Sequence, residues 1–539
     1  MILISPSGDR PKKLGVFAKY VPLSVPYGIG ALAGYLHHKG KKAEVLDEEI
    51  EPANPDVFRS KTKDLTPPYI FGISSLTAGI ARSIEIARTI KSIPDFSDAK
   101  VIFGGIHPTV LPEDVLQSGY ADIVVRGEGE KALEILYDRI KDGKDYSDVE
   151  GISFLSNGNT IHNDRAELVD LDTLPSFPYD MFYRYSSRYA LGFITSSRGC
   201  PYDCIFCSQR SISGKFYRFR SPETVVEEIE YLFKYRGQRH LTFQDDNFLP
   251  VKDRTMKLCE LIISRFGDSI SFDCQARADN VDDEVLAVMK QSGCRLIHVG
   301  IESASDRLLS LVRKRETLQQ IIDGVRLIQK HGIQVSGTFI LGFPTETSED
   351  RKAAYELAKE LDLAFVRFNN ATPYPGTKLY EMAKTQGRFL PGDNWENLNA
   401  CGSLTENPFR RNKLSFVPDG VSEGELRNDI IKYNMFFSLR PKRVFRLVFN
   451  RFGPAGWFEL PENWFLKPGE WYSLLRFSAK IGINFLVMLA GILKYKLRSL
   501  NDQGMPPQQS AEYAASARNT YLRKKRQHIP GTFQQQSWR

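Results

Sequence analysis

Cysteine is scarce in this chain of 539 residues, which contains only seven of them. So few cysteines in so long a chain exclude the disulfide framework that stabilises small secreted domains. The first residues, MILISPSGDRPKK, have too short an apolar run for a secretory signal peptide. We therefore expect the protein to work in the reducing cytoplasm.

Long hydrophobic runs are also lacking. The segment 481–493, IGINFLVMLAGIL, is uncharged but only 13 residues long, whereas a membrane-spanning helix needs about 20. A buried core helix and an interfacial helix are the two interpretations. The interfacial helix would bring the C-terminal region into peripheral contact with a membrane surface, and it is favoured by flanking basic residues, namely Arg476, Lys480, Lys494, Lys496 and Arg498.

Acidic residues are few near the C-terminus. Residues 441–539 contain 16 Lys and Arg against 5 Asp and Glu, which leaves 56 against 60 for the preceding part of the chain. A basic region indicates an anionic partner, either a membrane or a nucleic acid, or else a solvated surface. The mildly acidic body and the absence of a recognisable RNA-binding module argue against nucleic acid.

Length and composition predict several domains with substantial cores, because 42% of the residues are hydrophobic and 25% are charged. We expect an α/β protein with a front domain at 1–140 and a linker at 141–190 that carries a small hairpin. A second α/β domain at 191–400 and a basic, aromatic and mainly helical region at 401–504 follow. The polar residues 505–539 are typical of a disordered tail.

The front domain and the second domain both show strands that alternate with helices. In the front domain this pattern predicts a doubly wound, Rossmann-like parallel sheet, whose ligands bind at the carboxyl ends of the strands. The loops after Ser74, Gly104 and Arg126 are therefore candidate binding loops. From Phe193 onward the pattern gives six strand and helix pairs, which predicts a partial (β/α)6 barrel related to the eight-fold TIM barrel.

Three of the seven cysteines, Cys200, Cys204 and Cys207, lie within the segment CPYDCIFC directly after the first predicted barrel strand. Zinc sites usually use paired Cys-x2-Cys hooks, and the other four cysteines are isolated in the sequence. Three thiolates can instead hold a cubane iron-sulfur cluster and leave one iron open to an external ligand. Cysteines placed by coincidence in a core are the remaining alternative.

The Cys-x3-Cys-x2-Cys spacing, with Phe206 before the last thiol, resembles the signature of radical S-adenosylmethionine (SAM) enzymes. The resemblance implies a [4Fe-4S] cluster on Cys200, Cys204 and Cys207, whose open iron binds the methionine end of SAM. In that family one electron from the cluster cleaves SAM to a 5'-deoxyadenosyl radical. A flavodoxin-type or ferredoxin-type reductant is then an expected partner.

Further motifs over residues 190–385 match the same family and imply contacts to SAM. FQDDNF makes Asp245 and Asp246 candidates for the amino group of SAM, although the family's more familiar Gly-Gly-Glu form is absent. VGIES places Glu302 and Ser303 where the ribose is contacted, and a carboxylate can accept hydrogen bonds from both ribose hydroxyls. In GTFILGFPTET, the small Gly342 would let the backbone approach adenine closely.

The front domain resembles the cobalamin-binding domains found in some radical SAM enzymes. The resemblance rests on SSL at 74–76, on paired glycines 27 residues later, and on the loops GGIHPT and RGEGE. The family's third element, Asp-x-His-x2-Gly with the lower axial histidine, is missing, so a bound cobalt would lack that histidine and could shuttle a methyl group. The resemblance implies these cobalamin contacts: Ser74, Leu76, Gly104, Gly105, His107, Pro108 and Glu128.

These resemblances together imply a cobalamin-dependent radical SAM enzyme that methylates an unactivated carbon of a small-molecule or lipid-like substrate through the 5'-deoxyadenosyl radical and methylcobalamin. One alternative is a cyclase or rearrangement enzyme of the porphyrin-cyclase or hopanoid-modifying type, which would transfer no methyl group. Another is a radical SAM enzyme whose front domain is a cobalamin sensor or a relic.

The sequence identifies no catalytic residue beyond the three cluster cysteines. Tyr374 and His298 lie near the ends of predicted barrel strands and could face the cavity. For both residues a structural role is the interpretation that we favour. The residues that shape the substrate pocket carry no motif that would name the substrate.

Overall fold

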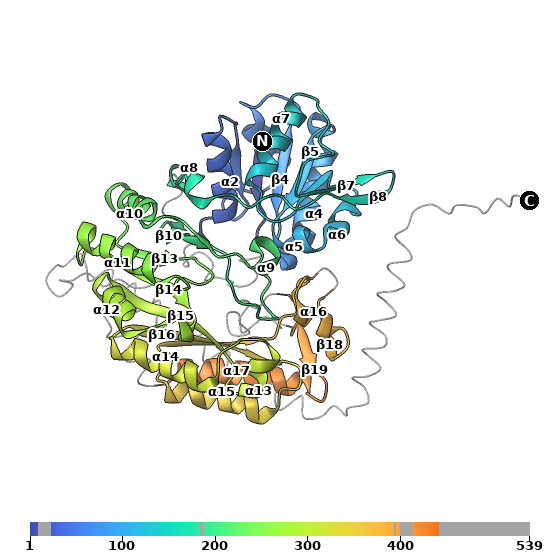
Figure 1. Cartoon of the computed structure of the whole chain (residues 1–539). Helices are drawn as coiled ribbons and strands as arrows, with labels where there is room; N and C mark the ends of the chain where they lie inside the picture. The colour runs from blue at the N-terminus through green and yellow to red at the C-terminus, as the bar shows by residue number, and fades with distance from the viewer. Residues whose placement is uncertain (9–22, 184–187, 393–394, 399–412, 441–539) are drawn as a thin grey trace, which may run out of the picture. The chain divides into compact units, whose positions relative to one another are not determined.

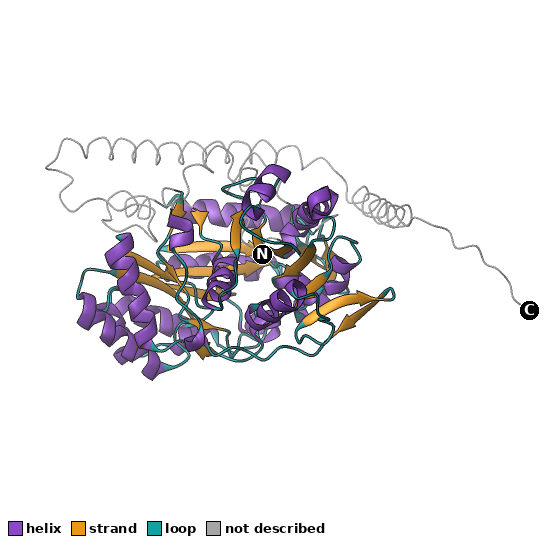
Figure 2. Cartoon of the chain, turned by 90° about the horizontal axis from the view of Figure 1, so that it is seen from above, coloured by secondary structure: helices purple, strands orange, loops and turns teal. Residues whose placement is uncertain are grey.

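The computed structural model describes residues 1–8, 23–183, 188–392, 395–398 and 413–440, and Figure 1 shows their arrangement. Residues 1–477 form one compact unit, and the second unit, 478–539, lies outside the described residues. Two sheets organise the described part of the chain, one with seven strands and one with six. Helices accompany the strands of both sheets (Figure 2).

The first sheet has the strand order β3-β1-β4-β5-β6-β7-β8, in which β3, β1, β4, β5 and β6 run parallel and β7 and β8 are antiparallel. The order reverses between β1 and β4, which confirms the doubly wound prediction. The elements are β1 (Ile2–Ser5), α2 (Tyr27–His38), β3 (Glu44–Asp47), α3 (Pro55–Thr62), β4 (Ile70–Ser74), α4 (Ile80–Ser92), β5 (Lys100–Gly104), α5 (Ile106–Val110), α6 (Pro112–Leu116), β6 (Ile123–Val125), α7 (Glu130–Lys141), β7 (Ile152–Ser156) and β8 (Asn159–His162).

Alternating strand residues supply the two apolar layers of this sheet. Leu3 and Ile102 pack with α2 and α7 on one face. Ile4 and Phe103 pack with α3 and α4 on the other face. Because successive side chains of a strand point to opposite faces, strands that are apolar throughout can be covered by helices on both sides. This is the physical reason why these segments form a central parallel sheet.

The hairpin predicted within residues 141–190 forms as β7 and β8. Asn157 and Gly158 connect the two strands with φ values of 50° and 78°, as a two-residue hairpin turn requires. β7 pairs with β6, so this part of the expected linker extends the first sheet. A shorter parallel pair joins β2 (Leu23–Ser24) to β9 (Tyr189–Ala190), and α8 (Asp180–Tyr183) lies between the hairpin and β9.

The second sheet has six parallel strands in the order β10-β13-β14-β15-β16-β17, which confirms the partial barrel. Its strands alternate in sequence with helices that bury apolar side chains against it. The elements are β10 (Phe193–Ile194), α10 (Pro222–Arg236), β13 (His240–Phe243), α11 (Lys252–Phe266), β14 (Ser271–Ala276), α12 (Asp283–Gln291), β15 (Cys294–Glu302), α13 (Asp306–Leu311), α14 (Leu318–Lys330), β16 (Gln334–Leu341), α15 (Ser348–Glu360), β17 (Phe365–Asn370) and α16 (Lys378–Ala383).

Helix α17 (Glu423–Ser438) covers the last strand of the barrel sheet. The side chain of Asn434 accepts a hydrogen bond from the Phe368 N–H at 3.1 Å and donates one to the Phe368 carbonyl at 2.8 Å. These bonds satisfy polar backbone groups that an edge strand would otherwise leave unpaired. A small antiparallel pair, β18 (Gly387–Phe389) with β19 (Phe416–Pro418), precedes this helix.

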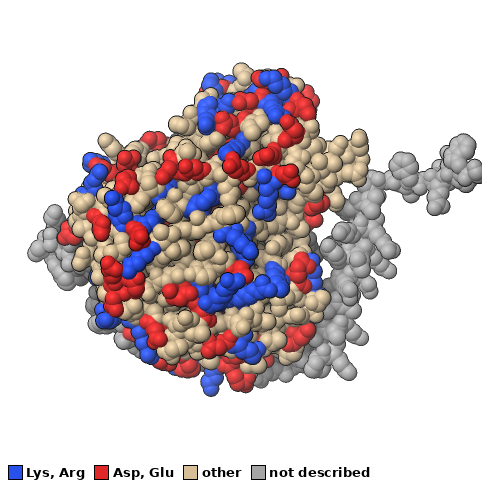
Figure 3. All heavy atoms as spheres, viewed as in Figure 1, with Lys and Arg blue, Asp and Glu red and all other residues tan. Residues whose placement is uncertain are grey.

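Most of the predicted C-terminal region, including 481–493 and the tail 505–539, lies outside the described residues. Among the residues that the structure does describe, no helix has the length and apolar character needed to cross a membrane. On the face shown in Figure 3, acidic and basic side chains are interspersed. The prediction that the basic region contacts a membrane surface therefore stays a prediction.

Candidate functional site

The three predicted cluster cysteines lie on one loop between β11 (Ser197–Arg198) and α9 (Arg210–Ser213). All three thiols are free and partly buried. Backbone hydrogen bonds fix the loop, because the Ile205 N–H donates to the Val312 carbonyl at 3.0 Å and the Ile205 carbonyl accepts from the Leu379 N–H at 3.0 Å. The loop is thus anchored to the end of α13 and to α16, the helices that follow β15 and β17.

Burial raises the pKa of all three thiols, to about 11 for Cys207. For Cys204 the nearby charges of Lys314 and Arg277 act in the opposite direction and favour the thiolate. Within the described ranges, no three Cys, His, Asp or Glu side chains converge closely enough to hold a single metal ion.

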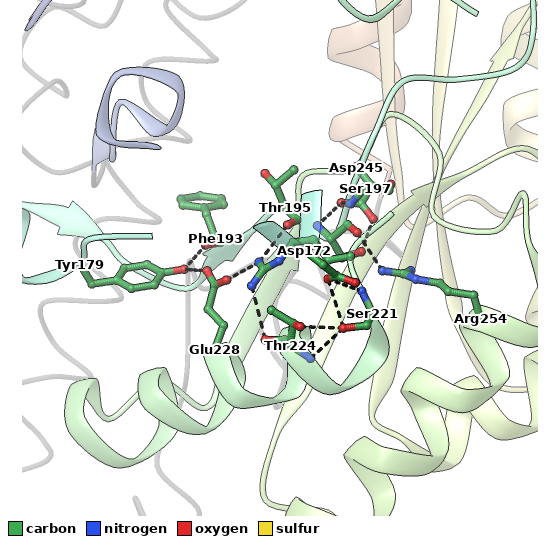
Figure 4. A network of polar contacts seen from close by, with 12 residues as sticks. Asp172, Tyr179, Phe193, Thr195, Ser197, Ser221, Thr224, Glu228, Asp245 and Arg254 are labelled. Atoms are coloured by element: carbon green, nitrogen blue, oxygen red, sulfur yellow. Dashed lines mark hydrogen bonds and ion pairs between the residues drawn. The ribbon is translucent and has the colours of Figure 1, made fainter. Parts of the chain in front are cut away.

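Asp245, predicted as a contact to SAM, is engaged by the backbone next to the cysteine loop. Its carboxylate is fully buried and accepts hydrogen bonds from the N–H groups of Ser196 at 2.7 Å and Ser197 at 3.1 Å, and from the Ser196 hydroxyl. Arg254 donates to the Ser196 carbonyl at 3.0 Å. Figure 4 shows Asp245 with Ser197 and Arg254. Asp245 therefore shapes the turn that leads to the cysteine loop.

Asp246 points toward the thiols. It accepts a hydrogen bond from the Gly199 N–H at 3.2 Å, and its charge acts on both Cys200 and Cys207. Burial raises the pKa of Asp246 to about 6, partly offset by the Gly199 N–H. Of the two predicted aspartates, Asp246 thus acts electrostatically on the thiols, whereas Asp245 is engaged by the Ser196 and Ser197 amides.

Glu302 ends β15 in a strained backbone conformation, with φ of 67°. Its carboxylate is buried, and burial raises its pKa to about 7. One oxygen lies 4.0 Å from the Lys314 ammonium, whereas Oε2 has no hydrogen-bond partner in the described part of the chain. A strained residue with an unpartnered buried oxygen at a strand end is a frequent feature of binding sites, and it fits a ligand that donates hydrogen bonds, such as a ribose.

The remaining predicted SAM contacts lie at neighbouring strand ends. The Phe206 ring lies 5.9 Å from the Phe343 ring, so the cysteine loop contacts the loop that follows Gly342. Gly342 has φ of 92°, and a Cβ there would lie 2.8 Å from the side chain of Leu426. Local packing thus already requires glycine at this position. The Ser303 hydroxyl accepts a hydrogen bond from the Ser305 N–H at 3.2 Å.

The carboxyl edge of the front sheet brings together the predicted Ser and Gly loops. Ser74 and Gly104 are paired in register, and the Ser75 N–H donates to the Gly104 carbonyl at 2.8 Å. Gly105 has φ of 95°, and a Cβ there would lie 2.8 Å from the Ser75 carbonyl oxygen. Glycine is therefore required where the two loops meet.

Two buried polar side chains at this edge lack partners. The Ser75 hydroxyl and both ring nitrogens of His107 are buried without a hydrogen bond to any described residue. Burial lowers the pKa of His107 to about 4, so the ring is neutral at pH 7. Leu76 is 71% exposed, and Pro108 is buried in α5. Unpartnered polar atoms beside an exposed apolar side chain fit a large ligand with polar and apolar parts, such as cobalamin.

Glu128 makes ion pairs with the barrel domain. It pairs with Arg198, at 3.3 Å, and with Arg218, which face each other across β11 and β12 (Arg218–Phe219). Arg198 also pairs with Glu130 at 2.7 Å. The predicted contact of Glu128 with cobalamin would have to be made alongside these ion pairs. Sequence reasoning missed Ser75 and both arginines, although Ser75 lies inside the SSL motif and Arg198 precedes the cysteine loop directly.

Two family models match the chain. Residues 194–358 match the radical SAM superfamily, and residues 14–137 match the B12 binding domain. The first match contains the cysteine loop, and the second contains the Ser and Gly loops at the carboxyl edge of the front sheet.

Individual proteins of this kind are similar over most of the chain. An uncharacterized methyltransferase, PH0819, of Pyrococcus horikoshii is 34% identical over 392 residues, which cover 72% of this chain and 82% of the relative. An anaerobic magnesium-protoporphyrin IX monomethyl ester cyclase of Rubrivivax gelatinosus is 26% identical over 434 residues, which cover 76% and 73%. The solved structure of the radical SAM methyltransferase TsrM from Kitasatospora setae, with cobalamin and a [4Fe-4S] cluster bound, superposes with a TM-score of 0.61 at 22% identity and covers 71% of this chain and 77% of that one.

Proposed function

Because the chain belongs to the radical SAM enzymes that carry a cobalamin-binding domain, we propose that it methylates an unactivated carbon of a small-molecule or lipid-like substrate. Its cofactors are a [4Fe-4S] cluster, SAM and cobalamin. The observation that carries the proposal is the contact of Glu128 and Glu130 with Arg198. The loop after β6 thereby adjoins the strand that leads into the cysteine loop, so one substrate could reach both cofactor sites.

When bound, the cluster with SAM supplies a radical that removes hydrogen from carbon, and cobalamin supplies a methyl group. The residues of this chain hold and orient these groups. Cys200, Cys204 and Cys207 are the proposed cluster ligands, on the anchored loop described above. We assign the amino group of SAM to Asp246, because Asp245 is already engaged by three hydrogen bonds at Ser196 and Ser197.

We assign Glu302 as the residue that binds the ribose of SAM, because its Oε2 lacks a hydrogen-bond partner in the described chain. Ser303 follows it, and Phe206 and Gly342 lie at neighbouring loops of the same strand ends. Cobalamin is assigned to the carboxyl edge of the front sheet, where Ser74, Leu76, Gly104, Gly105, His107 and Pro108 lie. Ser75 joins this set through its unpartnered hydroxyl.

A second candidate function keeps the same cofactors but rearranges or cyclises the substrate without adding carbon. The similarity to the magnesium-protoporphyrin IX monomethyl ester cyclase of Rubrivivax gelatinosus favours considering it. A relic or purely sensing front domain is the third candidate. The buried, unpartnered Ser75 and His107 side chains count against a relic, because a site without a ligand would gain stability by replacing them with apolar residues.

Some expectations rest on the sequence and are proposed on that basis. These are the domain boundaries near 140, 190, 400 and 504, an electron donor of the flavodoxin or ferredoxin type, and contact of the basic region 401–504 with a membrane surface. None of them enters the assignment of the cofactor residues.

The test uses the full chain, reconstituted anaerobically with iron, sulfide and hydroxocobalamin, and desalted. It is reduced with titanium(III) citrate in the presence of SAM, and S-adenosylhomocysteine and 5'-deoxyadenosine are measured by chromatography. We expect both products, with S-adenosylhomocysteine formed only when cobalamin is bound. Loss of a methyl group from SAM reports methyl transfer, whereas 5'-deoxyadenosine reports radical formation.

The outcomes separate the three candidates. 5'-Deoxyadenosine with bound cobalamin but without S-adenosylhomocysteine would favour cyclisation or rearrangement. 5'-Deoxyadenosine from a chain that retains no cobalamin would favour a relic domain. A Cys204→Ala variant should form neither product, while Cys259→Ala, which changes a cysteine outside the loop, should form both.

A further inference from the structure

The inner face of the barrel sheet is polar. The outward residues of its strands, such as Leu241, Val299 and Phe339, are buried against the helices. Side chains alternate along a strand, so the intervening residues share the inner face, and the strand registers align them. The inner-face residues are His240 and Thr242 on β13, Ser271, Asp273 and Gln275 on β14, Leu296, His298 and Gly300 on β15, Gln334, Ser336, Thr338 and Ile340 on β16, and Phe365, Arg367 and Asn369 on β17.

This face meets the cysteine loop at its carboxyl end. Ile340 packs against the apolar cluster that contains Ile205 and Phe206, on either side of which lie the cluster cysteines. Ile340 is paired with Asn369, and two residues earlier Thr338 is paired with Arg367. Two residues of a strand span about 7 Å. The backbone of Arg367 therefore lies two residues along the strands from the level of Ile340, where the cysteine loop contacts the sheet.

The negative charge of Asp273 on this face is already shared among its neighbours. Asp273 accepts hydrogen bonds from His240 Nε2 at 2.8 Å, from the Thr242 hydroxyl at 3.0 Å and from His298 Nε2 at 3.3 Å. Although burial acts in the other direction, the two imidazoles hold the pKa of Asp273 below its ordinary value. The Asp273 carboxylate is thus ionised and fully engaged by these donors.

Arg367 is the charged side chain among the inner-face positions of β16 and β17. It is exposed, and within the described ranges its side chain forms no hydrogen bond or ion pair. An arginine carries its charge at every physiological pH. Its planar guanidinium matches a carboxylate or phosphate through two parallel hydrogen bonds. Among the described residues, the Arg367 guanidinium therefore has no ion-pair partner of its own on this face.

We infer that Arg367 binds an anionic group, a carboxylate or a phosphate, of the substrate. The inference deepens the proposed function, on which it rests, by assigning the substrate class. The hydroxyl of Thr338, which is paired with Arg367, can form a hydrogen bond with the polar part of such a molecule. Gln275 and His298, which are paired two residues further along the sheet, offer an amide and an imidazole for the same purpose. With its anion at Arg367, the substrate would extend toward the cysteine loop.

The experiment measures binding of three fluorinated probes to the reconstituted full chain by 19F NMR line broadening. The probes are 4-fluorobenzoate, 4-fluorophenyl phosphate and uncharged 4-fluorobenzamide. The variants are Arg367→Gln and, as a matched control, Arg326→Gln, which removes an exposed arginine of α14 that pairs with Glu360. We expect an anionic probe to bind the unsubstituted chain and the control alike, and to bind Arg367→Gln about tenfold more weakly.

Stronger binding of 4-fluorobenzoate would identify a carboxylate, and stronger binding of 4-fluorophenyl phosphate would identify a phosphate. Equal binding of 4-fluorobenzamide, equal affinity of both variants, or no binding of either anion would overturn the inference. The cobalamin-dependent formation of S-adenosylhomocysteine by the unsubstituted chain tests the proposed function separately. A chain that forms this product without anion binding at Arg367 would refute the inference alone.

Discussion

Arg198 lies between two carboxylates of the front domain, 2.7 Å from an oxygen of Glu130 and 3.3 Å from an oxygen of Glu128. Arg198 leads into the cysteine loop, and Glu128 lies in the loop that follows β6. Both glutamates are almost fully buried, and Glu128 also pairs with Arg218. This cluster of charges therefore links the loop next to the proposed cobalamin site to the proposed cluster site.

The first prediction concerns Glu128→Gln. The substitution leaves Arg198 and Arg218 with less negative charge between them, and removing one partner of a buried ion pair commonly costs about 3 kcal/mol or more. We expect lower stability in denaturant unfolding and an altered electron paramagnetic resonance spectrum of the reduced cluster. The control is Glu167→Gln, which breaks the exposed pair with Lys131 and should cost less than about 1 kcal/mol. Equal effects of the two substitutions would contradict a linking role.

The second prediction separates the two adjacent aspartates. Asp246→Asn should weaken the perturbation of the cluster spectrum by SAM, because Asp246 faces the thiols. Asp245→Asn should lower thermal stability, because an amide cannot accept all the hydrogen bonds that its carboxylate receives from Ser196 and Ser197. Spectra with titrated SAM and melting curves of both variants provide the measurement. A larger loss of SAM binding in Asp245→Asn would reverse the assignment.

Sequence patterns predicted the parts of the fold that depend on local alternation. The doubly wound order of the front sheet follows from runs such as KVIFG, in which the three central apolar residues are buried between two helical layers. The cysteine loop was predicted because its spacing and its place after a strand are both local features. Asn157 and Gly158 likewise predict their hairpin without any distant contact.

Contacts between distant segments could not be predicted in this way. Glu128 was expected to contact cobalamin, but its partner Arg218 lies 90 residues further along the chain. Asp245 and Asp246 are equivalent in a motif, and only the folded loop shows which of them the Ser196 and Ser197 amides engage. His107 was expected from its loop, but only the three-dimensional structure shows that its ring nitrogens have no hydrogen-bond partner among the described residues.

The third prediction concerns Gly105→Ala. At φ of 95° any other residue is strained, and the added Cβ would lie 2.8 Å from the Ser75 carbonyl oxygen. Gly119→Ala is the control, because Gly119 also has a positive φ, 78°, but open space around it. We expect each variant to lose about 1–2 kcal/mol from backbone strain, and only Gly105→Ala to lose cobalamin on desalting as well. Retention of cobalamin by Gly105→Ala, measured by its absorbance, would exclude this loop from the binding site.

The last prediction is a pH dependence that arises from His107. Its pKa is about 4 in the folded chain because of burial and about 6.5 in the unfolded chain. The unfolded chain therefore binds more protons between these values, so the free energy of unfolding falls as the pH falls through this window. Linkage gives a loss of about 2 kcal/mol between pH 7 and pH 5 for the cobalamin-free protein.

His107→Gln is the variant that tests this origin, because glutamine is similar in size and does not titrate. Denaturant unfolding of the unsubstituted chain and of the variant at pH 7 and pH 5 isolates the contribution of His107, since all other titrating groups are shared by the two proteins. We expect the stability loss on acidification to be about 2 kcal/mol smaller in the variant. An equal stability loss in both proteins would mean that His107 is not held neutral by burial. Bound cobalamin that hydrogen-bonds to the neutral ring should increase the difference in stability loss between the two proteins.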